Sequence, residues 1–149
     1  FLLYRMNELR KIVNRYLGEK FILVDLIANE RSDYIRITID SEDTVTLDDT
    51  SSLTKAILEA GEIDPLYPSG FRLEITSPGI DYPLSFPFQY KKNINRSLTV
   101  RLTDDGKEKS LVGKMLSADD LGIEILNNEG KISVQYDQII SANVNVSFK

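Results

Sequence analysis

Apolar and polar residues follow two different periods in the first half of the chain. Residues 3–17 place apolar side chains every three or four positions, which predicts an amphipathic helix. Residues 21–28 and 34–40 alternate apolar and polar positions, which predicts two strands of an antiparallel sheet with one covered face. The residues expected on the covered face are Ile22, Val24, Leu26 and Ala28 in the first strand and Ile35, Ile37 and Ile39 in the second.

A second helix is expected to begin after Thr46. Thr46 suits the N-cap position, and Asp49 stands at the third helical position, as in a capping box. Gly61 is expected to end this helix, and residues 71–76 alternate again as a third strand. The expected buried stripe of the helix consists of Leu53, Ala56, Ile57 and Ala60. This part of the chain therefore predicts an α+β domain, helix-strand-strand-helix-strand, with two helices on one side of a small three-stranded sheet.

The pattern changes to short apolar segments after residue 84, and turn clusters such as Asp104-Asp105-Gly106 separate several of them. The predicted strands are residues 98–102, 110–116, 122–126, 131–136 and 140–146, with a short helical turn at residues 136–139. Five closely spaced strands in about 60 residues indicate a small all-β barrel of the SH3 or Sm type. We therefore expect two domains, residues 1–84 and residues 85–149.

The composition removes several kinds of chemistry. The chain has 149 residues, 42% of them hydrophobic and 28% charged, as in folded soluble proteins. It contains neither cysteine nor histidine, which excludes disulfides, thiolate nucleophiles, zinc–thiolate sites, histidine metal ligation and Ser-His-Asp catalysis. Charged residues interrupt every long apolar run, so no membrane span is expected. We expect no cofactor, no metal and no enzymatic activity.

The charge is distributed unevenly. Residues 1–84 hold 9 basic and 15 acidic side chains, a net charge of −6, whereas residues 85–149 hold 9 and 8, a net charge of +1. This distribution favours a basic protein or a local RNA feature as the partner over a nucleic-acid duplex.

The segment at residues 73–84, L-E-I-T-S-P-G-I-D-Y-P-L, is the most informative in the chain. Ser77-Pro78-Gly79 ends a strand, because proline lacks the backbone donor and glycine accepts a positive φ in a turn. Pro83 follows closely, so the segment predicts a rigid connector to a second domain. An ordinary strand end with a proline turn is the alternative reading of Ser77-Pro78-Gly79 alone.

This segment resembles the signature S-P-G-hydrophobic-D-x-P-L of the RimP ribosome maturation factors. Ile39-Asp40 followed by V-T-L-D-D at residues 45–49 is similar to another string of that family, Y-I-D followed by G-V-T-L-D-D. The barrel-like end extends the resemblance over nearly the whole chain. Two positions depart from the pattern: Thr44 stands where the family often has glycine, and Tyr82 where it usually has arginine.

The resemblance implies a cytoplasmic, non-enzymatic assembly factor for the small (30S) ribosomal subunit. Such a protein binds the free subunit late in maturation and helps a small-subunit protein near the decoding centre to dock. The expected partners are that protein and 16S rRNA, with no membrane and no small-molecule substrate, and we expect a monomer. The alternative is an SH3- or Sm-like RNA- or peptide-binding module with no ribosomal role.

Two candidate surfaces follow. The partner-binding surface consists of Asp40, Asp48, Asp49, Ser77, Pro78, Gly79, Asp81, Tyr82 and Pro83, where Asp81 is also expected to brace the turn through backbone donors. The RNA-binding surface consists of Lys91, Lys92, Arg96 and Arg101. These four lie in residues 85–103, a stretch without acidic residues and with Phe88 and Tyr90 nearby. A solvated turn explains this basic stretch equally well.

The carboxylates at residues 40–49 fail as a calcium loop. A loop that begins at Asp40 would need glycine where Val45 stands and a final glutamate where Ser51 stands. A capped helix with a solvated acidic loop explains them better. A hydrolase that uses Asp40 and Asp48 as its carboxylate pair is the other alternative.

Overall fold

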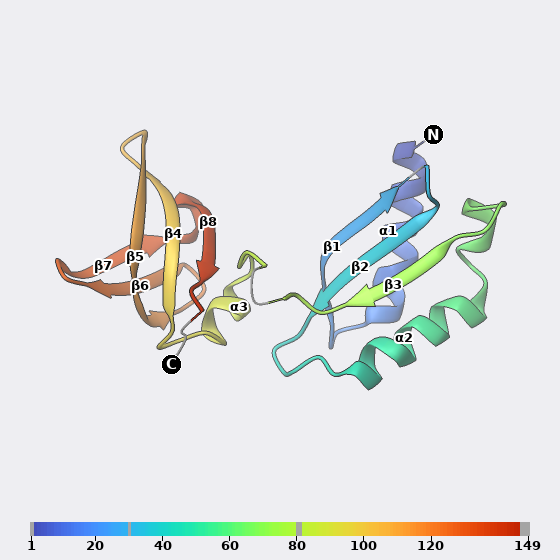
Figure 1. The fold of residues 1–149 in the computed structure, drawn as a ribbon, viewed down its shortest axis with the longest axis horizontal. Helices are drawn as coiled ribbons and strands as arrows, with labels where there is room; N and C mark the ends of the chain where they lie inside the picture. The colour runs from blue at the N-terminus through green and yellow to red at the C-terminus, as the bar shows by residue number, and fades with distance from the viewer. Residues whose placement is uncertain (1, 30, 80–81, 147–149) are drawn as a thin grey trace. The chain divides into compact units, whose positions relative to one another are not determined.

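The computed structural model describes residues 2–29, 31–79 and 82–146. The chain divides into two compact units, Phe1–Pro78 and Gly79–Lys149 (Figure 1). The elements of the first unit are α1 (Leu2–Leu17), β1 (Ile22–Asn29), β2 (Tyr34–Asp40), α2 (Leu47–Ala60), a 3-10 turn (Asp64–Leu66) and β3 (Arg72–Thr76). The predicted order of helices and strands is confirmed in this unit.

β2 is the central strand of the first sheet, whose order is β1-β2-β3. β1 pairs with it antiparallel, as a short turn allows. The antiparallel pairing expected for the first two strands is thereby confirmed, whereas β3, whose direction was not predicted, pairs with β2 parallel. The reason is the crossover through α2, which returns the chain to the end of the sheet where β2 begins.

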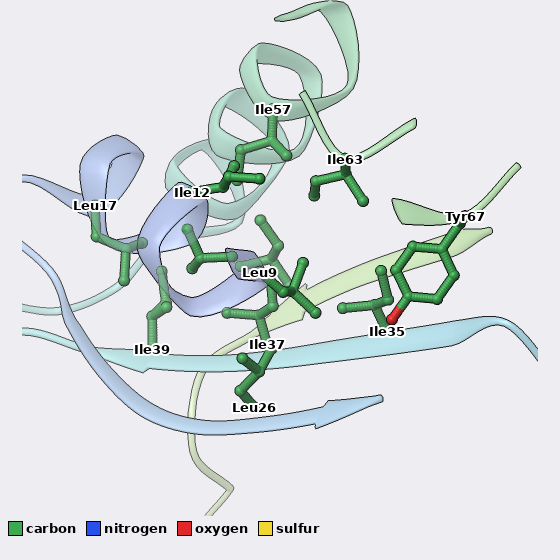
Figure 2. Close-up of a cluster of buried hydrophobic side chains, with 12 residues drawn as sticks. Leu9, Ile12, Leu17, Leu26, Ile35, Ile37, Ile39, Ile57, Ile63 and Tyr67 are labelled. Carbon is green, nitrogen blue, oxygen red and sulfur yellow. The ribbon is translucent and has the colours of Figure 1, made fainter. Parts of the chain in front are cut away.

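The core of the first unit lies between the sheet and its two helices. Ile35, Ile37 and Ile39 on β2 have no exposed surface, and Leu9 of α1 and Ile57 of α2 pack over them (Figure 2). Each such side chain contributes about 1.5–3 kcal/mol when fully buried. The covered face predicted for the second strand is therefore confirmed.

Two details of the predicted core were wrong. A β-bulge lies between Leu23 and Asp25, so Leu23 packs on the core before the bulge and Leu26 after it, while Ile22 is exposed. A bulge adds one residue and reverses which face follows. In α2 the core-facing residues are Thr50, Leu53 and Ile57, and the alanines expected in the stripe, Ala56 and Ala60, are exposed.

The second unit contains one five-stranded sheet of order β7-β6-β5-β4-β8, in which all neighbours are antiparallel. Its elements are α3 (Pro87–Lys91), β4 (Ser97–Asp104), β5 (Lys107–Ala118), β6 (Gly122–Asn127), β7 (Gly130–Gln135), a 3-10 turn (Tyr136–Gln138) and β8 (Ile139–Val144). The five predicted strands and the helical turn are confirmed. α3 was not predicted, because five residues are too few for a helical period.

The second sheet is open in the described residues, since β7 and β8 form its two edges and do not pair with each other. β6 and β7 run across the direction of β4 (Figure 1). The closed SH3- or Sm-like barrel is therefore not confirmed and stays a prediction.

Gly113 lies where β5 passes close to β6. A Cβ at this position would lie 2.5 Å from Cγ2 of Ile125 and 2.6 Å from the carbonyl oxygen of Leu126. The second of these neighbours is backbone and cannot move without disturbing the sheet. The absence of a side chain is what permits the close approach.

We expect Gly113→Ala to lower the free energy of unfolding of the second unit by about 1–3 kcal/mol, the usual cost of overpacking. Ser110→Ala, at an exposed position of the same strand, is the matched control and is expected to change stability little. Urea unfolding followed by circular dichroism measures both variants. Equal stability of the two would show that the strands separate readily at this point.

Candidate partner-binding surfaces

Asp40 ends β2 and is buried, with 9% of its surface exposed. Its Oδ1 accepts a hydrogen bond of 2.8 Å from the backbone N–H of Ser41. The hydroxyl of Ser41 in turn accepts a bond of 3.2 Å from the N–H of Asp43. These bonds shape the turn after the strand, and they leave Asp40 little surface for a partner.

Asp48 and Asp49 are neighbours in sequence but have different environments. The side chain of Thr46 accepts a hydrogen bond of 3.1 Å from the N–H of Asp49, whose Oδ2 accepts one of 2.9 Å from the N–H of Thr46. This reciprocal pair is the predicted capping box. Lys20 Nζ lies 3.7 Å from Asp49 Oδ1. The carboxylate of Asp49 therefore caps α2, while Asp48 is exposed.

The pKa of the Asp49 carboxyl is lowered from its ordinary value. The main cause is the hydrogen bond from the backbone N–H of Thr46, and the nearby Lys20 adds to it. Both interactions favour the ionised carboxylate.

The connector after β3 has a defined local geometry where it is described. Ser77 and Gly79 are exposed, and the N–H of Tyr82 donates to the carbonyl of Gly79 at 2.9 Å. Pro78 is half-buried, as is Tyr82, and Pro83 is exposed. Asp81 lies outside the described residues, so its expected role as a brace stays a prediction.

The chain joins the second unit firmly from Leu84 onward. The N–H of Leu84 donates to the carbonyl of Ala142 in β8 at 2.8 Å. The buried side chain of Gln89 accepts hydrogen bonds from the N–H groups of Ser85 and Phe86, at 2.8 and 3.0 Å. Residues 77–83 therefore lie between the end of β3 and this anchor.

The four basic residues of the expected RNA surface do not form one compact group. Lys91 Nζ lies 2.7 Å from Asp120 Oδ1, and Arg101 Nε lies 3.1 Å from Glu108 Oε1. Arg96 precedes β4 and has no carboxylate within ion-pair distance in the part of the chain that the structure describes. Arg101 lies five residues further along, about 16 Å away for an extended strand. Lys91, Lys92 and Arg96 share one segment, and Arg101 stands apart.

The sheet adds a basic residue that the chain order concealed. β5 places Lys114 opposite Ser97, next to Arg96, and the side chain is exposed. Lys114 was missed because it lies 18 residues after Arg96 in the sequence. Only strand pairing brings these two positions together.

The described residues hold no group of three carboxylates placed to bind a metal ion. No helix among them is long and apolar enough to cross a membrane.

Comparison with known proteins identifies the family. The model of the RimP N-terminal domain matches residues 9–81, which cover the first unit except its first eight residues and reach into the connector. The ribosome maturation factor RimP of Christiangramia forsetii is 34% identical over 161 aligned positions, which cover 95% of this chain and 98% of that protein. The chain belongs to the RimP family. The resemblance found in residues 39–49 and 73–84 is thereby confirmed.

A second relative is similar over less of its length. The ribosome maturation factor RimP of Frankia casuarinae is 36% identical over 96 positions, which cover 61% of this chain and 35% of that protein. The similarity to RimP of C. forsetii includes both units, so the family assignment does not depend on the N-terminal domain alone.

We expect Asp49→Ala to destabilise the first unit near neutral pH, with Asp48→Ala as the control that alters only an exposed carboxylate. The folded state lowers the pKa of Asp49, so the ionised form stabilises the fold above the ordinary value of 3.8. This stabilisation is lost as the pH falls through the lowered pKa. The difference in unfolding free energy between wild type and Asp49→Ala is therefore expected to narrow below about pH 3.8. Urea titrations at several pH values measure it, and a constant difference would contradict the ionic part of the cap.

Proposed function

We propose that the chain is a non-enzymatic assembly factor that acts in the maturation of the small ribosomal subunit. The observation that carries the proposal is the 34% identity with RimP of C. forsetii over almost the full length of both chains. That relative is named a ribosome maturation factor, which indicates the process, and the two units of this chain provide surfaces for binding. The proposed place of action is the cytoplasm, and the proposed state is a monomer.

The first unit is proposed to face a basic ribosomal protein near the decoding centre. It carries 9 basic and 14 acidic side chains over residues 1–78, a net charge of −5. Exposed Asp48 and the connector, Ser77 to Pro83, are the parts proposed to make contact, with Asp40 and Asp49 shaping the surface behind them. Complementary charge of this kind accelerates association and disfavours wrong partners.

The second unit is proposed to contact 16S rRNA through Lys91, Lys92, Arg96 and Arg101, to which we add Lys114. The two ion pairs in this set are exposed, and exposed pairs contribute only about 0–1 kcal/mol. A phosphate can therefore displace Asp120 or Glu108 at small cost. The strand order β7-β6-β5-β4-β8 is compatible with the proposed SH3- or Sm-like barrel.

Assembly assistance of this type needs no chemistry by the protein. A factor that binds one arrangement of RNA and protein better than the alternatives raises the population of that arrangement. The factor then leaves when the mature contacts replace its own.

Co-sedimentation with isolated small subunits, large subunits and complete ribosomes tests the proposal. We expect selective binding to free small subunits that weakens as salt rises. Binding to none of the particles, or equally to all, would leave the generic RNA- or peptide-binding module, and tight binding to short naked RNA would favour it.

A single substitution tests the basic segment. We expect Arg96→Ala to weaken small-subunit binding and to reduce the slope of log affinity against log salt by about one unit, because one phosphate contact is lost. Lys109→Ala is the matched control, since Lys109 Nζ lies 2.9 Å from Asp104 in an exposed pair away from this segment. Equal slopes of log affinity against log salt for both variants would show that Arg96 does not contact the subunit, without contradicting binding to the small subunit.

A further inference from the structure

A groove of about 650 Å³ lies between α2 and the outer edge of β3 in the first unit. Its lining includes Leu47, Ser51, Thr54 and Leu58 from α2 and Leu73 and Ile75 from β3. Leu47 is 82% exposed and Leu58 is 47% exposed. The outward side of α2 thus presents two leucines with short polar side chains between them, at the edge of a sheet.

β3 has a strand neighbour on one side only, because it is the edge strand of the order β1-β2-β3. The N–H of Arg72 donates to the carbonyl of Asp33 at 2.9 Å, so the backbone groups of Arg72 point toward β2. Backbone groups alternate in direction along a strand, and those of Leu73 and Ile75 therefore point away from β2. Such an edge is a template for another strand.

An extended segment bound beside β3 would both pair with the free edge of the strand and cover the exposed leucines of α2. Its backbone would pair with the outward N–H and C=O groups of Leu73 and Ile75. Every second side chain would point to the helical side of the sheet, beneath Leu47 and Leu58, and apolar side chains would fill the groove there. A helix or a globular surface would cover the leucines but leave the edge of β3 unpaired.

The charges around the groove favour a basic occupant. Asp48 is exposed beside Leu47 at one end, and Glu59 lies beside Leu58 at the other. Lys55 between them lies 4.0 Å from Glu59, so the two carboxylates outnumber the single ammonium group and these three residues have a net charge of −1. A second copy of the chain is disfavoured, because it would place the same acidic groups, on a unit of net charge −5, against one another.

From these observations we infer that the groove binds an extended segment of a partner protein, apolar on the face beneath α2 and basic at its two ends, which joins the sheet as a fourth strand beside β3. The inference deepens the proposed function and rests on it only in taking the partner to be a protein. The segment contributes the direct contact, and the acidic rim selects it over neutral or acidic strands.

A synthetic peptide tests the groove without the ribosome. The probe is Lys-Val-Thr-Val-Thr-Val-Thr-Val-Lys, whose valines share one face and whose lysines stand at its two ends, and the control peptide has glutamate in place of each lysine. We expect the probe to slow amide hydrogen exchange of Leu73 and Ile75 at least tenfold in the full chain, measured by NMR. The amide of Glu74, which already faces β2, is expected to change little. The glutamate peptide is expected to bind at least tenfold more weakly.

Matched substitutions locate the site. Leu58→Asn is expected to weaken probe binding at least tenfold, whereas Leu3→Asn, at a leucine of α1 that is 73% exposed, leaves it unchanged. Absence of protection at Leu73 and Ile75, or equal binding by both variants, would overturn the inference. Protection of the same amides on raising the protein concentration without peptide would also overturn it, because a second copy would then be the occupant.

Co-sedimentation of Leu58→Asn with small subunits separates this inference from the proposed function. Weaker sedimentation of Leu58→Asn than of wild type and Leu3→Asn supports both. Equal sedimentation of all three overturns the groove as a docking site and leaves the assembly factor intact. If wild type does not sediment with small subunits and the peptide still protects β3, the proposed function fails and the groove remains.

Discussion

The burial of Ile35, Ile37 and Ile39 beneath two helices is the constraint on which the first unit depends (Figure 2). A register slip of one residue would turn all three side chains toward solvent, so β2 has one acceptable placement. β2 is central, and α2 must return across the same face before the chain can pair again. That return makes β3 parallel to β2 and leaves it at the edge. The free edge and the groove beside it are consequences of how the core is covered.

Some charged residues of the chain stabilise the fold, and others are exposed to partners. The sequence positions alone do not distinguish the two groups. Asp49 caps α2, and Asp40 holds the turn after β2, so both carboxylates serve the fold. Asp48, Arg96 and Lys114 are exposed. Exposed ion pairs such as Lys91 with Asp120 belong to neither group alone. Such a pair contributes only about 0–1 kcal/mol to stability, so a charged group of a partner can readily replace one of its members.

In the second unit, neighbouring strands approach each other at two glycines so closely that no side chain would fit between them. Besides Gly113, Gly122 approaches the neighbouring strand so closely that a Cβ would lie 2.3 Å from the carbonyl oxygen of Val134.

Tyr90 of α3 packs against Tyr136 with ring centroids 4.9 Å apart, and burial raises the pKa of both phenols to about 12. Both tyrosines are therefore neutral at physiological pH, and the packing that holds α3 to the sheet does not change with pH there.

The order of elements in the first unit, the five strands of the second, the covered face of β2, the capping box and the family could all be predicted from the sequence. Each of these depends on residues close together in the chain, where periodicity and capping chemistry act directly. It could not determine the bulge in β1 or the exposure of Ala56 and Ala60, because these depend on how one element packs on another. The expected site residues were also chosen from short segments of the sequence. Lys114 and the groove beside β3 were therefore missed. Both features depend on the folded arrangement, since strand pairing and helix packing bring together positions that lie far apart in the sequence.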